Sequence, residues 1–275
     1  MKFVLSFISI LAAVIAVPNA EAQVPRLDPI AVQMAQAISK SKQDSVIVFD
    51  FSGPGVKLNA LGQRFGQDFS EDLAKANPSL HVLDRARISA QCAEHRLSLS
   101  ALSDPSLAIW IAQDLGAKAV VLGKLINLDN NLDITIAAYS VRDARGIIGL
   151  KTTSSLSSEV RTLIGTEIPD ISSLSTEPVY LPNKDVIGYP KCQHCPEAHY
   201  TEDAVKQQIE GTVTLEAIVG ADGRAHNISV LKGLPFGLTR QAVIAVGSWM
   251  FKPAVDADGK PVAVRLVVEV TFRLR

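Results

Sequence analysis

The chain ends in the stretch P-V-A-V-R-L-V-V-E-V-T-F-R-L-R, residues 261–275, and this stretch decides the fold of the C-terminal part. Apolar side chains occupy every second position from Val262 to Leu274, and mostly polar ones lie between them. Because a period of two places alternate side chains on opposite faces, the stretch is predicted to be a long strand with one apolar and one mixed face. It begins at Pro261, where the missing N–H is tolerated. The apolar face needs a cover, so packing partners are expected in the residues that come before it.

The residues before this strand can supply two helices and two further strands. Periodicity predicts a helix over 201–208, a strand over 213–219 and a returning strand through Ile228 and Val230. A helix is predicted over 237–249, with one apolar stripe formed by Leu238, Ala242, Ala245, Val246 and Trp249. The sequence G-A-D-G at residues 220–223 is a turn signal between the two strands. The sequence therefore predicts an α+β domain over residues 189–275, with two helices on a three-stranded antiparallel sheet.

Three motifs in this domain resemble the C-terminal domain of the TonB family. They are E-G-T-V-T-L-E-A-I-V-G-A-D-G-R-A (residues 210–225), G-L-T-R-Q-A-V-I-A-V-G-S-W-M-F-K-P-A (residues 237–254) and D-G-K-P-V (residues 258–262). The motifs follow one another in the family's order and with similar spacing, and a terminal apolar strand comes after them. In position, the Tyr-Pro that precedes the family's first helix corresponds to Tyr200-Thr201, so the proline is replaced.

The resemblance implies a function in partner binding. TonB-family proteins carry proton-motive energy from inner-membrane partners to outer-membrane transporters, and their C-terminal domain captures an extended transporter segment by strand addition. The edge of a small sheet offers unpaired N–H and C=O groups that can take another strand. We therefore expect a protein that binds outer-membrane TonB-dependent receptors or other envelope proteins, linked to energy-dependent transmembrane transport. The expected partner-binding residues are His199, Tyr200, Arg265, Val267 and Glu269.

The sequence departs from the family in two features that leave a second interpretation open. A short leader stands where the family has an anchor helix, and a globular domain replaces the long Pro-rich spacer. Force cannot pass from a membrane motor through a chain that is not attached to it. The alternative is a structural envelope adaptor or docking protein without energy coupling.

The first 22 residues have the layout of a secretory signal peptide. Met1-Lys2 is a positive start, residues 3–17 are apolar apart from serines, and Ala20-Glu21-Ala22 is a small-x-small cleavage site. This layout predicts export to the periplasm, with only indirect membrane contact. The alternative is an uncleaved anchor in the inner membrane, although the apolar run is shorter than the roughly 20 residues that span a bilayer.

Residues 23–158 are predicted to form an α/β sandwich domain, followed by a linker over 159–188 that is rich in serine and proline and holds a short helix near Val160 to Ile164. Sequence periodicity predicts helices over 30–40, 58–73 and 104–115, and one through Arg87 and Cys92. It predicts strands over 45–51, 80–84, 119–123, 132–139 and 146–153. This order resembles the N-terminal domains of bacterial envelope proteins of the FlgO, CsgG and TolB type. The matching pieces are V-I-V-F-D-F (46–51), V-L-D-R (82–85) and L-G-A-K-A-V-V-L-G (115–123). The resemblance implies a structural or docking module.

Two cysteines three positions apart, Cys192 and Cys195, are expected to form a disulfide in an oxidising compartment. One alternative is a metal half-site, which lacks four ligands even with the nearby histidines. Another is a redox centre, which would need the N-terminus of a helix in a thioredoxin-like fold. Cys92 lies in a predicted helix and is expected to be a small buried side chain.

Composition and charge exclude several classes of function. The chain has 275 residues, a formal net charge of −1 and only 5% aromatic residues, so it offers no basic field or stacking surface for nucleic acid. No acid–base pair or activated nucleophile stands at a meaningful spacing, so we expect neither an enzyme nor a cofactor or metal site.

Overall fold

The computed structural model describes residues 24–53, 57–128, 130–168, 170, 179–181 and 188–274. The predicted signal peptide, residues 1–22, and half of the predicted linker lie outside these residues. The chain divides into two compact units, each made of two stretches of sequence. Unit 1 combines residues 1–84 with 116–168, and unit 2 combines residues 85–115 with 169–275. Among the described residues, no helix is both long and apolar enough to cross a membrane.

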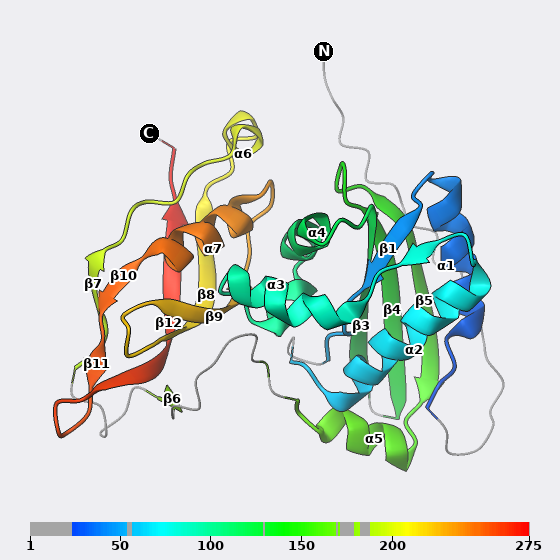
Figure 1. Cartoon of the computed structure of the whole chain (residues 1–275), viewed down its shortest axis with the longest axis horizontal. Coiled ribbons are helices and arrows are strands. Elements are labelled where there is room, and N and C mark those ends of the chain that lie inside the picture. The colour runs from blue at the N-terminus through cyan, green and yellow to red at the C-terminus, as the bar shows by residue number, and fades with distance from the viewer. Residues whose placement is uncertain are drawn as a thin grey trace. The chain divides into compact units, whose positions relative to one another are not determined.

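Unit 1 is built on a five-stranded mixed sheet in the order β2-β1-β3-β4-β5 (Figure 1). Strand β1 lies between β2 and β3 and is parallel to both, whereas β3, β4 and β5 form an antiparallel meander. The strands are β1 (Ser45–Val48), β2 (His81–Val82), β3 (Ala119–Leu128), β4 (Asn131–Ser140) and β5 (Gly146–Ser155). All five lie where the sequence predicts strands, and the mixed order confirms the α/β class of this part.

Two helices, α1 (Asp28–Lys40) and α2 (Ala60–Ala76), cover one face of this sheet (Figure 1). Their apolar faces share one buried cluster with β1, β3 and β4, whose members include Met34, Ile38, Phe65, Phe69, Val46, Val121 and Ile134. The side chain of Asn59 caps α2 by accepting a hydrogen bond from the amide of Gly62 at 2.8 Å. A third helix, α5 (Ser158–Gly165), packs against α2 at the start of the region predicted as a linker.

Unit 2 contains the antiparallel sheet that the sequence predicts for the C-terminal domain. Its order is β11-β12-β8-β9, with β6 pairing in parallel with the start of β12. The strands are β6 (Val179–Tyr180), β8 (Gly211–Val219), β9 (Ala225–Lys232), β11 (Ala254–Val255) and β12 (Pro261–Phe272). The three long strands are the predicted ones, and the two-residue strands β6 and β11 add to them.

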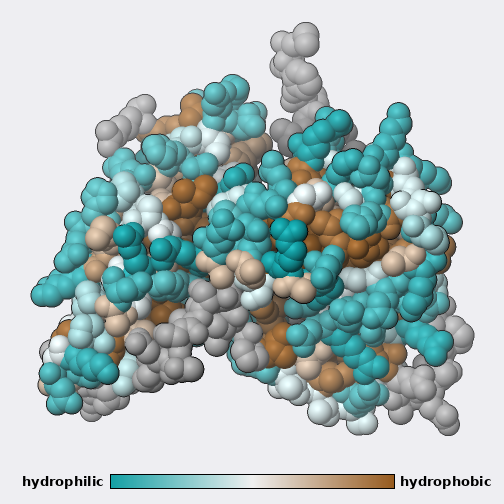
Figure 2. Space-filling view, viewed as in Figure 1, coloured by the Kyte–Doolittle hydropathy of each residue, from teal (hydrophilic) through white to brown (hydrophobic). Residues whose placement is uncertain are grey.

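Helix α7 (Leu238–Ser248) packs on β8 and β9, and the short helix α6 (Glu202–Lys206) precedes β8 (Figure 1). The stripe of α7 predicted to face the sheet is buried, as shown by Leu238, Ala242, Ala245 and Val246. A separate two-stranded ribbon pairs β7 (Lys191–His194) with β10 (Met250–Lys252). Figure 2 shows hydrophilic residues over much of the face in view, with an apolar patch over the region where Figure 1 draws α7.

Residues 85–115 belong to unit 2, although the sequence places them inside the predicted N-terminal domain of residues 23–158. They form a 3₁₀ turn (Arg85–Arg87), α3 (Ile88–Glu94), a second 3₁₀ turn (Leu99–Ser103) and α4 (Pro105–Asp114). Helix α4 packs on α7, where the guanidinium of Arg240 lies 4.5 Å from the ring centroid of Trp110. The predicted boundary differs because these helices look alike in sequence whichever sheet they cover.

Candidate functional site

The long strand β12 has one edge that is only partly paired. On one side it pairs with β8 without interruption from Val264 to Phe272. On the other side it pairs with β11 at residues 261–262 and with β6 at residues 263–264. Among the described residues, no strand pairs with this second side beyond Val264. The stretch from Arg265 to Phe272 is called the free edge below.

The backbone groups that point out of the free edge can be assigned from the register. At the turn between β8 and β9, the amide of Gly220 donates to the carbonyl of Arg224 at 2.9 Å. Backbone groups alternate in direction along an antiparallel strand, so even-numbered residues of β8 face β9 and odd-numbered residues face β12. Val264 lies opposite Val219 and the register continues unbroken, so the even-numbered residues of β12 bond to β8. The N–H and C=O groups of residues 265, 267, 269 and 271 therefore point outward.

Side chains on the free edge follow the predicted alternation. Val268, Val270 and Phe272 are buried against the core of unit 2, whereas the side chains at 265, 267, 269 and 271 are exposed. Val267 is 56% exposed, which is high for a valine in the middle of a sheet. The residues whose backbone groups point outward are thus the same residues whose side chains lie on the exposed face.

A groove of about 630 Å³ runs beside the C-terminal half of the free edge. Residues 269–274 form one wall of the groove. Residues 195–198, called the rim below, also line the groove, and Tyr200 and Trp249 complete the lining. The groove therefore joins a strand edge with unpaired backbone groups to a surface with two aromatic rings.

The rim is held in place by a covalent bond and by hydrogen bonds. Cys192 and Cys195 form a disulfide, which confirms the pairing predicted from their spacing. Cys192 also lies in β7, which pairs with β10. The indole Nε1 of Trp249 donates to the carbonyl oxygen of Pro196 at 2.9 Å. The disulfide and the hydrogen bond both act within residues 192–196. They therefore restrict the backbone of the rim more than the backbone of a loop without such links is restricted.

Two of the residues that line the groove, Tyr200 and Phe272, are aromatic and touch each other. The ring of Tyr200 meets the buried ring of Phe272 edge-on, with centroids 5.3 Å apart. The phenol hydroxyl of Tyr200 donates to the carbonyl oxygen of Ile209 at 3.2 Å, which fixes the ring. Desolvation, and then the nearby carboxylate of Glu210, raise the pKa of Tyr200, so the hydroxyl stays a donor at neutral pH.

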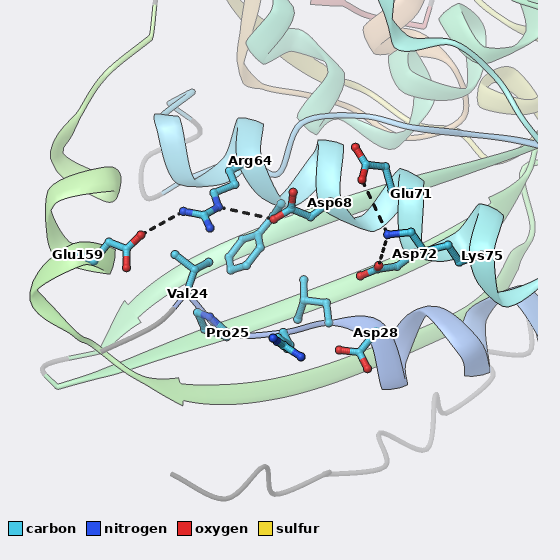
Figure 3. A pocket seen from close by; sticks show the side chains of 12 residues that line it. Val24, Pro25, Asp28, Arg64, Asp68, Glu71, Asp72, Lys75 and Glu159 are labelled. Atoms are coloured by element: carbon cyan, nitrogen blue, oxygen red, sulfur yellow. Dashed lines mark hydrogen bonds and ion pairs between the residues drawn. The ribbon is translucent and has the colours of Figure 1, made fainter. Parts of the chain in front are cut away.

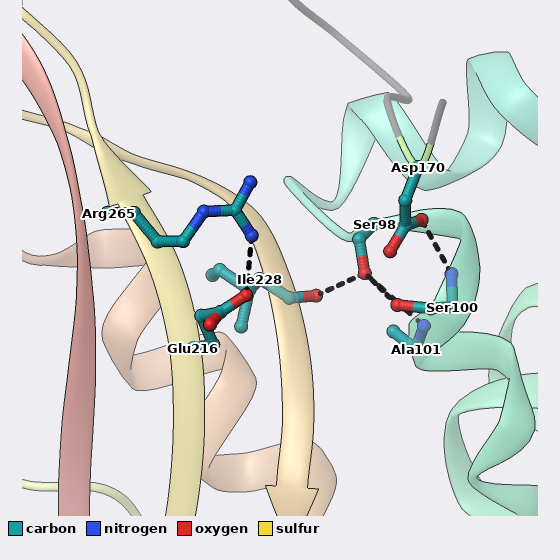
Figure 4. A network of polar contacts seen from close by, with 7 residues as sticks. All are labelled: Ser98, Ser100, Ala101, Asp170, Glu216, Ile228 and Arg265. Atoms are coloured by element: carbon teal, nitrogen blue, oxygen red, sulfur yellow. Dashed lines mark hydrogen bonds and ion pairs between the residues drawn. The ribbon is translucent and has the colours of Figure 1, made fainter. Parts of the chain in front are cut away.

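The five predicted binding residues are distributed unequally around the groove. Tyr200 and Glu269 line it, and Val267 lies on the free edge before it. The guanidinium of Arg265 is 2.6 Å from the carboxylate of Glu216 on the neighbouring strand (Figure 4). His199 is exposed and is not part of the lining.

Sequence reasoning missed two parts of this site, Trp249 and the rim. Trp249 has the helical spacing of a core residue and was predicted as one, yet its ring also lines the groove. The rim residues have no periodicity that would connect them with β12. The disulfide prediction was the one signal in the sequence that this segment is ordered.

The opposite edge of the sheet, at β9, is occupied by a segment of the same chain. The amide of Ile228 donates to the carbonyl of Arg96 at 2.8 Å, and the amide of Ser98 donates to the carbonyl of Ile228 at 3.0 Å. The hydroxyl of Ser98 also reaches the carbonyl of Ile228, and Asp170 accepts from the amide of Ser100 at 2.8 Å (Figure 4). Leu97, which stands between Arg96 and Ser98 in the chain, is fully buried. An incoming strand would have to displace this segment, so the free edge of β12 is the more accessible one.

Unit 1 has a second hollow, of about 540 Å³, between α2, α5 and the residues that lead into α1 (Figure 3). Its charged side chains pair largely with one another. Arg64 bridges Asp68 and Glu159, and Lys75 lies near Glu71 and Asp72 (Figure 3). Because these surface pairs satisfy each other, the hollow is a weaker candidate for ligand binding than the groove. Within the described residues, no group of three or more His, Cys, Asp or Glu side chains is arranged to hold a metal ion.

The C-terminal part of the chain is similar to a known protein family. Residues 196–274 match the model of the family described as Gram-negative bacterial TonB protein C-terminal. No curated protein matches the sequence.

Several solved structures are similar in part. The LpoB C-terminal domain from Salmonella enterica is 21% identical with a TM-score of 0.40, covering 47% of this chain and 96% of that one. The Pseudomonas aeruginosa TonB C-terminal domain is 26% identical with a TM-score of 0.26, and the match covers 37% of this chain and 99% of that one. TolB from Acinetobacter baumannii is 10% identical with a TM-score of 0.24, and the match covers 83% of this chain and 38% of that one. These scores are too low to carry an argument, and the resemblance of residues 23–158 to the FlgO, CsgG and TolB type stays a prediction.

The groove and the free edge lie almost entirely within the matched residues. The motifs that resemble TonB in the sequence are the same segments that form β8, the β8–β9 turn, α7, β10 and the start of β12. Residues 196–274 are therefore a TonB-like C-terminal domain.

Proposed function

We propose that unit 2 binds an extended segment of another envelope protein by adding it as a strand to the free edge of β12. The observation that carries this proposal is the row of four outward-pointing residues, 265, 267, 269 and 271, beside a groove with an ordered rim. Strand addition uses main-chain hydrogen bonds for affinity and side-chain pockets for specificity. The free edge can supply the main-chain hydrogen bonds, and the groove can supply a pocket for side chains.

The expected length of the bound segment follows from the size of the free edge. Eight residues of β12, from 265 to 272, extend beyond the pairing with β6. At about 3.4 Å per residue they span roughly 27 Å, so a matching partner strand has about seven or eight residues. Each inter-strand hydrogen bond contributes about 0.5–1.5 kcal/mol net, so a few of them together with apolar burial in the groove are enough for specific binding.

The partner that fits best is a periplasm-facing segment of an outer-membrane transporter. The match of residues 196–274 to the TonB C-terminal family supports this choice. On this proposal the protein is exported, acts in the periplasm and takes part in energy-dependent transport together with an anchored motor. An adaptor without energy coupling would use the same edge, and the two functions differ in whether binding changes with the proton-motive force.

The test uses the full chain and a pair of variants at one position. Val267→Pro removes an outward N–H, whereas Val267→Thr keeps the N–H and the β-branched shape. Peptides from the N-terminal segments of outer-membrane receptors are titrated into each protein, and binding is followed by amide chemical shifts. We expect shifts along residues 265–272 in the wild type and in Val267→Thr, and at least a tenfold loss of affinity in Val267→Pro.

Thermal unfolding of both variants shows whether the fold survives. If Val267→Pro is folded and binds as well as Val267→Thr, the strand is not added at this position. If the amides of the free edge stay silent in the wild type while peptide binds elsewhere, the proposed site is wrong regardless of how the variants behave.

A further inference from the structure

We propose that the segment captured by β12 carries one basic side chain that faces Glu269, within a strand whose alternate residues are apolar. This inference rests on the proposed function and deepens it by naming the chemistry of the partner. The observations that lead to it are the charges on the exposed face of β12 and their partners within the sheet.

Two opposite charges lie on the exposed face of β12 within the free edge, and only one is already neutralised. Arg265 forms an ion pair with Glu216 at 2.6 Å, so its charge is satisfied inside the sheet. Glu269 has neither an ion-pair partner nor a side-chain hydrogen bond among the described residues. It lies opposite Thr214 on β8, which carries no charge. The free edge therefore presents a negative charge at its centre.

An added strand would bring its side chains close to Glu269. Residues directly opposite each other on paired strands have Cβ atoms about 4.5–5.5 Å apart, and opposite charges at that distance stabilise the pair. Glu269 is exposed on this face of β12, so a lysine or arginine of the partner that lies opposite it would form an ion pair at the surface of the sheet. An acidic residue at the same position would be repelled.

The other face of the added strand meets the groove. Tyr200 and Trp249 line it and offer aromatic surface, above the buried Val270 and Phe272. Alternate residues of the partner that point to this side are therefore apolar, and β-branched residues suit an extended strand. The matching pattern is an alternation of apolar and polar residues with one central basic residue.

A second basic residue in the partner is disfavoured further along the strand. Arg273 follows Glu269 by four positions, lines the same groove and has no ion-pair partner among the described residues. A cation of the partner near Arg273 would be repelled, so the partner needs a single cation rather than a basic run. This requirement separates specific recognition from general attraction to a positively charged peptide.

The test measures the charge preference with two probe peptides and the full chain. The first probe is acetyl-Ser-Val-Thr-Val-Lys-Val-Thr-Val-Ser-amide, and the second has glutamate in place of lysine. We expect the wild type to bind the lysine probe about five- to tenfold more tightly than the glutamate probe at low salt, and the preference to shrink in high salt. Glu269→Lys should reverse the preference. The matched control is Asp258→Lys in the turn before β12, which changes the net charge equally and should leave the preference unchanged.

Each outcome decides between the two proposals. If both probes bind and shift the free edge but Glu269→Lys leaves the preference unaltered, the charge inference is wrong and the proposed function stands. If Asp258→Lys alters the preference as much as Glu269→Lys, the effect is one of net charge and the inference is again wrong. If neither these probes nor the receptor peptides move the amides of residues 265–272, both proposals fail together.

Discussion

The ring of Tyr200 stands edge-on to the ring of Phe272, with centroids 5.3 Å apart and the ring planes at 81°. Phe272 is the last residue of β12 and is almost completely buried, whereas Tyr200 lies just before α6 and lines the groove. The pair connects the core of unit 2 with the wall of the candidate site. A substitution at one ring should therefore affect folding, and a substitution at the other should affect binding.

Phe272→Ala is expected to destabilise unit 2 by about 3–5 kcal/mol, because it removes a buried ring and leaves a cavity. Tyr200→Ala is expected to leave the unit folded and to weaken peptide binding, because it removes one lining of the groove. Thermal unfolding and peptide titration of both variants check this division. Tyr200→Phe serves as the control, since it keeps the ring contact and loses only the hydrogen bond to Ile209. Equal loss of folding in Phe272→Ala and Tyr200→Ala would contradict the assignment of Tyr200 to the site.

A second prediction concerns the closed edge of the sheet at β9. Ser98 has φ −75° and ψ 160°, so proline fits its backbone without strain. Ser98→Pro removes the amide that donates to Ile228, whereas Ser98→Ala keeps that amide and loses only the hydroxyl. We expect the proline variant to be less stable than the alanine variant by about 1–3 kcal/mol, because a buried carbonyl loses its donor. Urea unfolding of the two variants gives the difference.

The same experiment tests whether residues 85–115 are part of the C-terminal fold. If the two variants are equally stable, the segment does not contribute through its backbone. If Ser98→Pro also creates a second set of peptide-induced shifts along β9, the segment has been protecting that edge from strand addition.

The elements of both sheets could be predicted from the sequence because their signals are local. β12 was predicted over 261–275 and ends at Phe272, and its alternation gave the buried and exposed faces correctly. β1 was predicted to continue to Phe51 and ends at Val48, because the amide of Phe51 turns away to the carbonyl of Gly62. Such an end depends on a contact with α2 that no pattern within the strand reveals.

The candidate site could be predicted only in part. The free edge follows from the alternation and from the resemblance to TonB, but the rim and Trp249 come together through the β7–β10 ribbon. The assignment of residues 85–115 depends on Leu97 lying beside Ile228, which is 131 positions away in the chain. Pairings of that separation leave no trace in the periodicity of a single sequence.

A third prediction addresses the disulfide of the rim. Replacing both Cys192 and Cys195 with serine should lower the stability of unit 2 by no more than about 2 kcal/mol, since the closed loop is very short. The same change should weaken peptide binding, because the rim loses its cross-link while Trp249 still holds Pro196. Titration of a receptor peptide into the wild type and the double variant measures the effect. Unchanged affinity with an intact fold would show that the rim needs no cross-link.

A fourth prediction concerns Cys92, the free cysteine of the described chain, which is fully buried. Burial, and to a lesser degree the carboxylate of Asp170, raise the pKa of its thiol to about 12. Because the unfolded thiol loses its proton first, this contribution to stability is complete below about pH 9 and is lost as the pH rises from 9 toward 12. The unfolding free energy should therefore fall by up to about 1.4 kcal/mol per pH unit in that range, and less steeply in Cys92→Ala.

Thiol labelling checks the same residue by a second route. A thiol reagent should label no cysteine in the folded, unreduced protein and one cysteine after denaturation. Three labelled cysteines after denaturation would instead show that Cys192 and Cys195 are not bonded. Rapid labelling of Cys92 in the folded protein would contradict its burial.

The last prediction tests the packing of unit 1 at Gly62, in the first turn of α2. A Cβ atom placed on Gly62 would overlap the carbonyl oxygen of Phe51, and that backbone cannot move freely because the amide of Phe51 donates to the carbonyl of Gly62. Gly62→Ala should therefore destabilise unit 1 by about 1–3 kcal/mol, even though alanine favours helices. Gly165→Ala in α5 is the matched control, since a Cβ there meets no atom within 4 Å and should be neutral or stabilising by up to about 1 kcal/mol. Urea unfolding followed at amides of β1 and β3 reports on unit 1 directly. A Gly62→Ala protein as stable as Gly165→Ala would mean that α2 does not sit this close to the chain after β1.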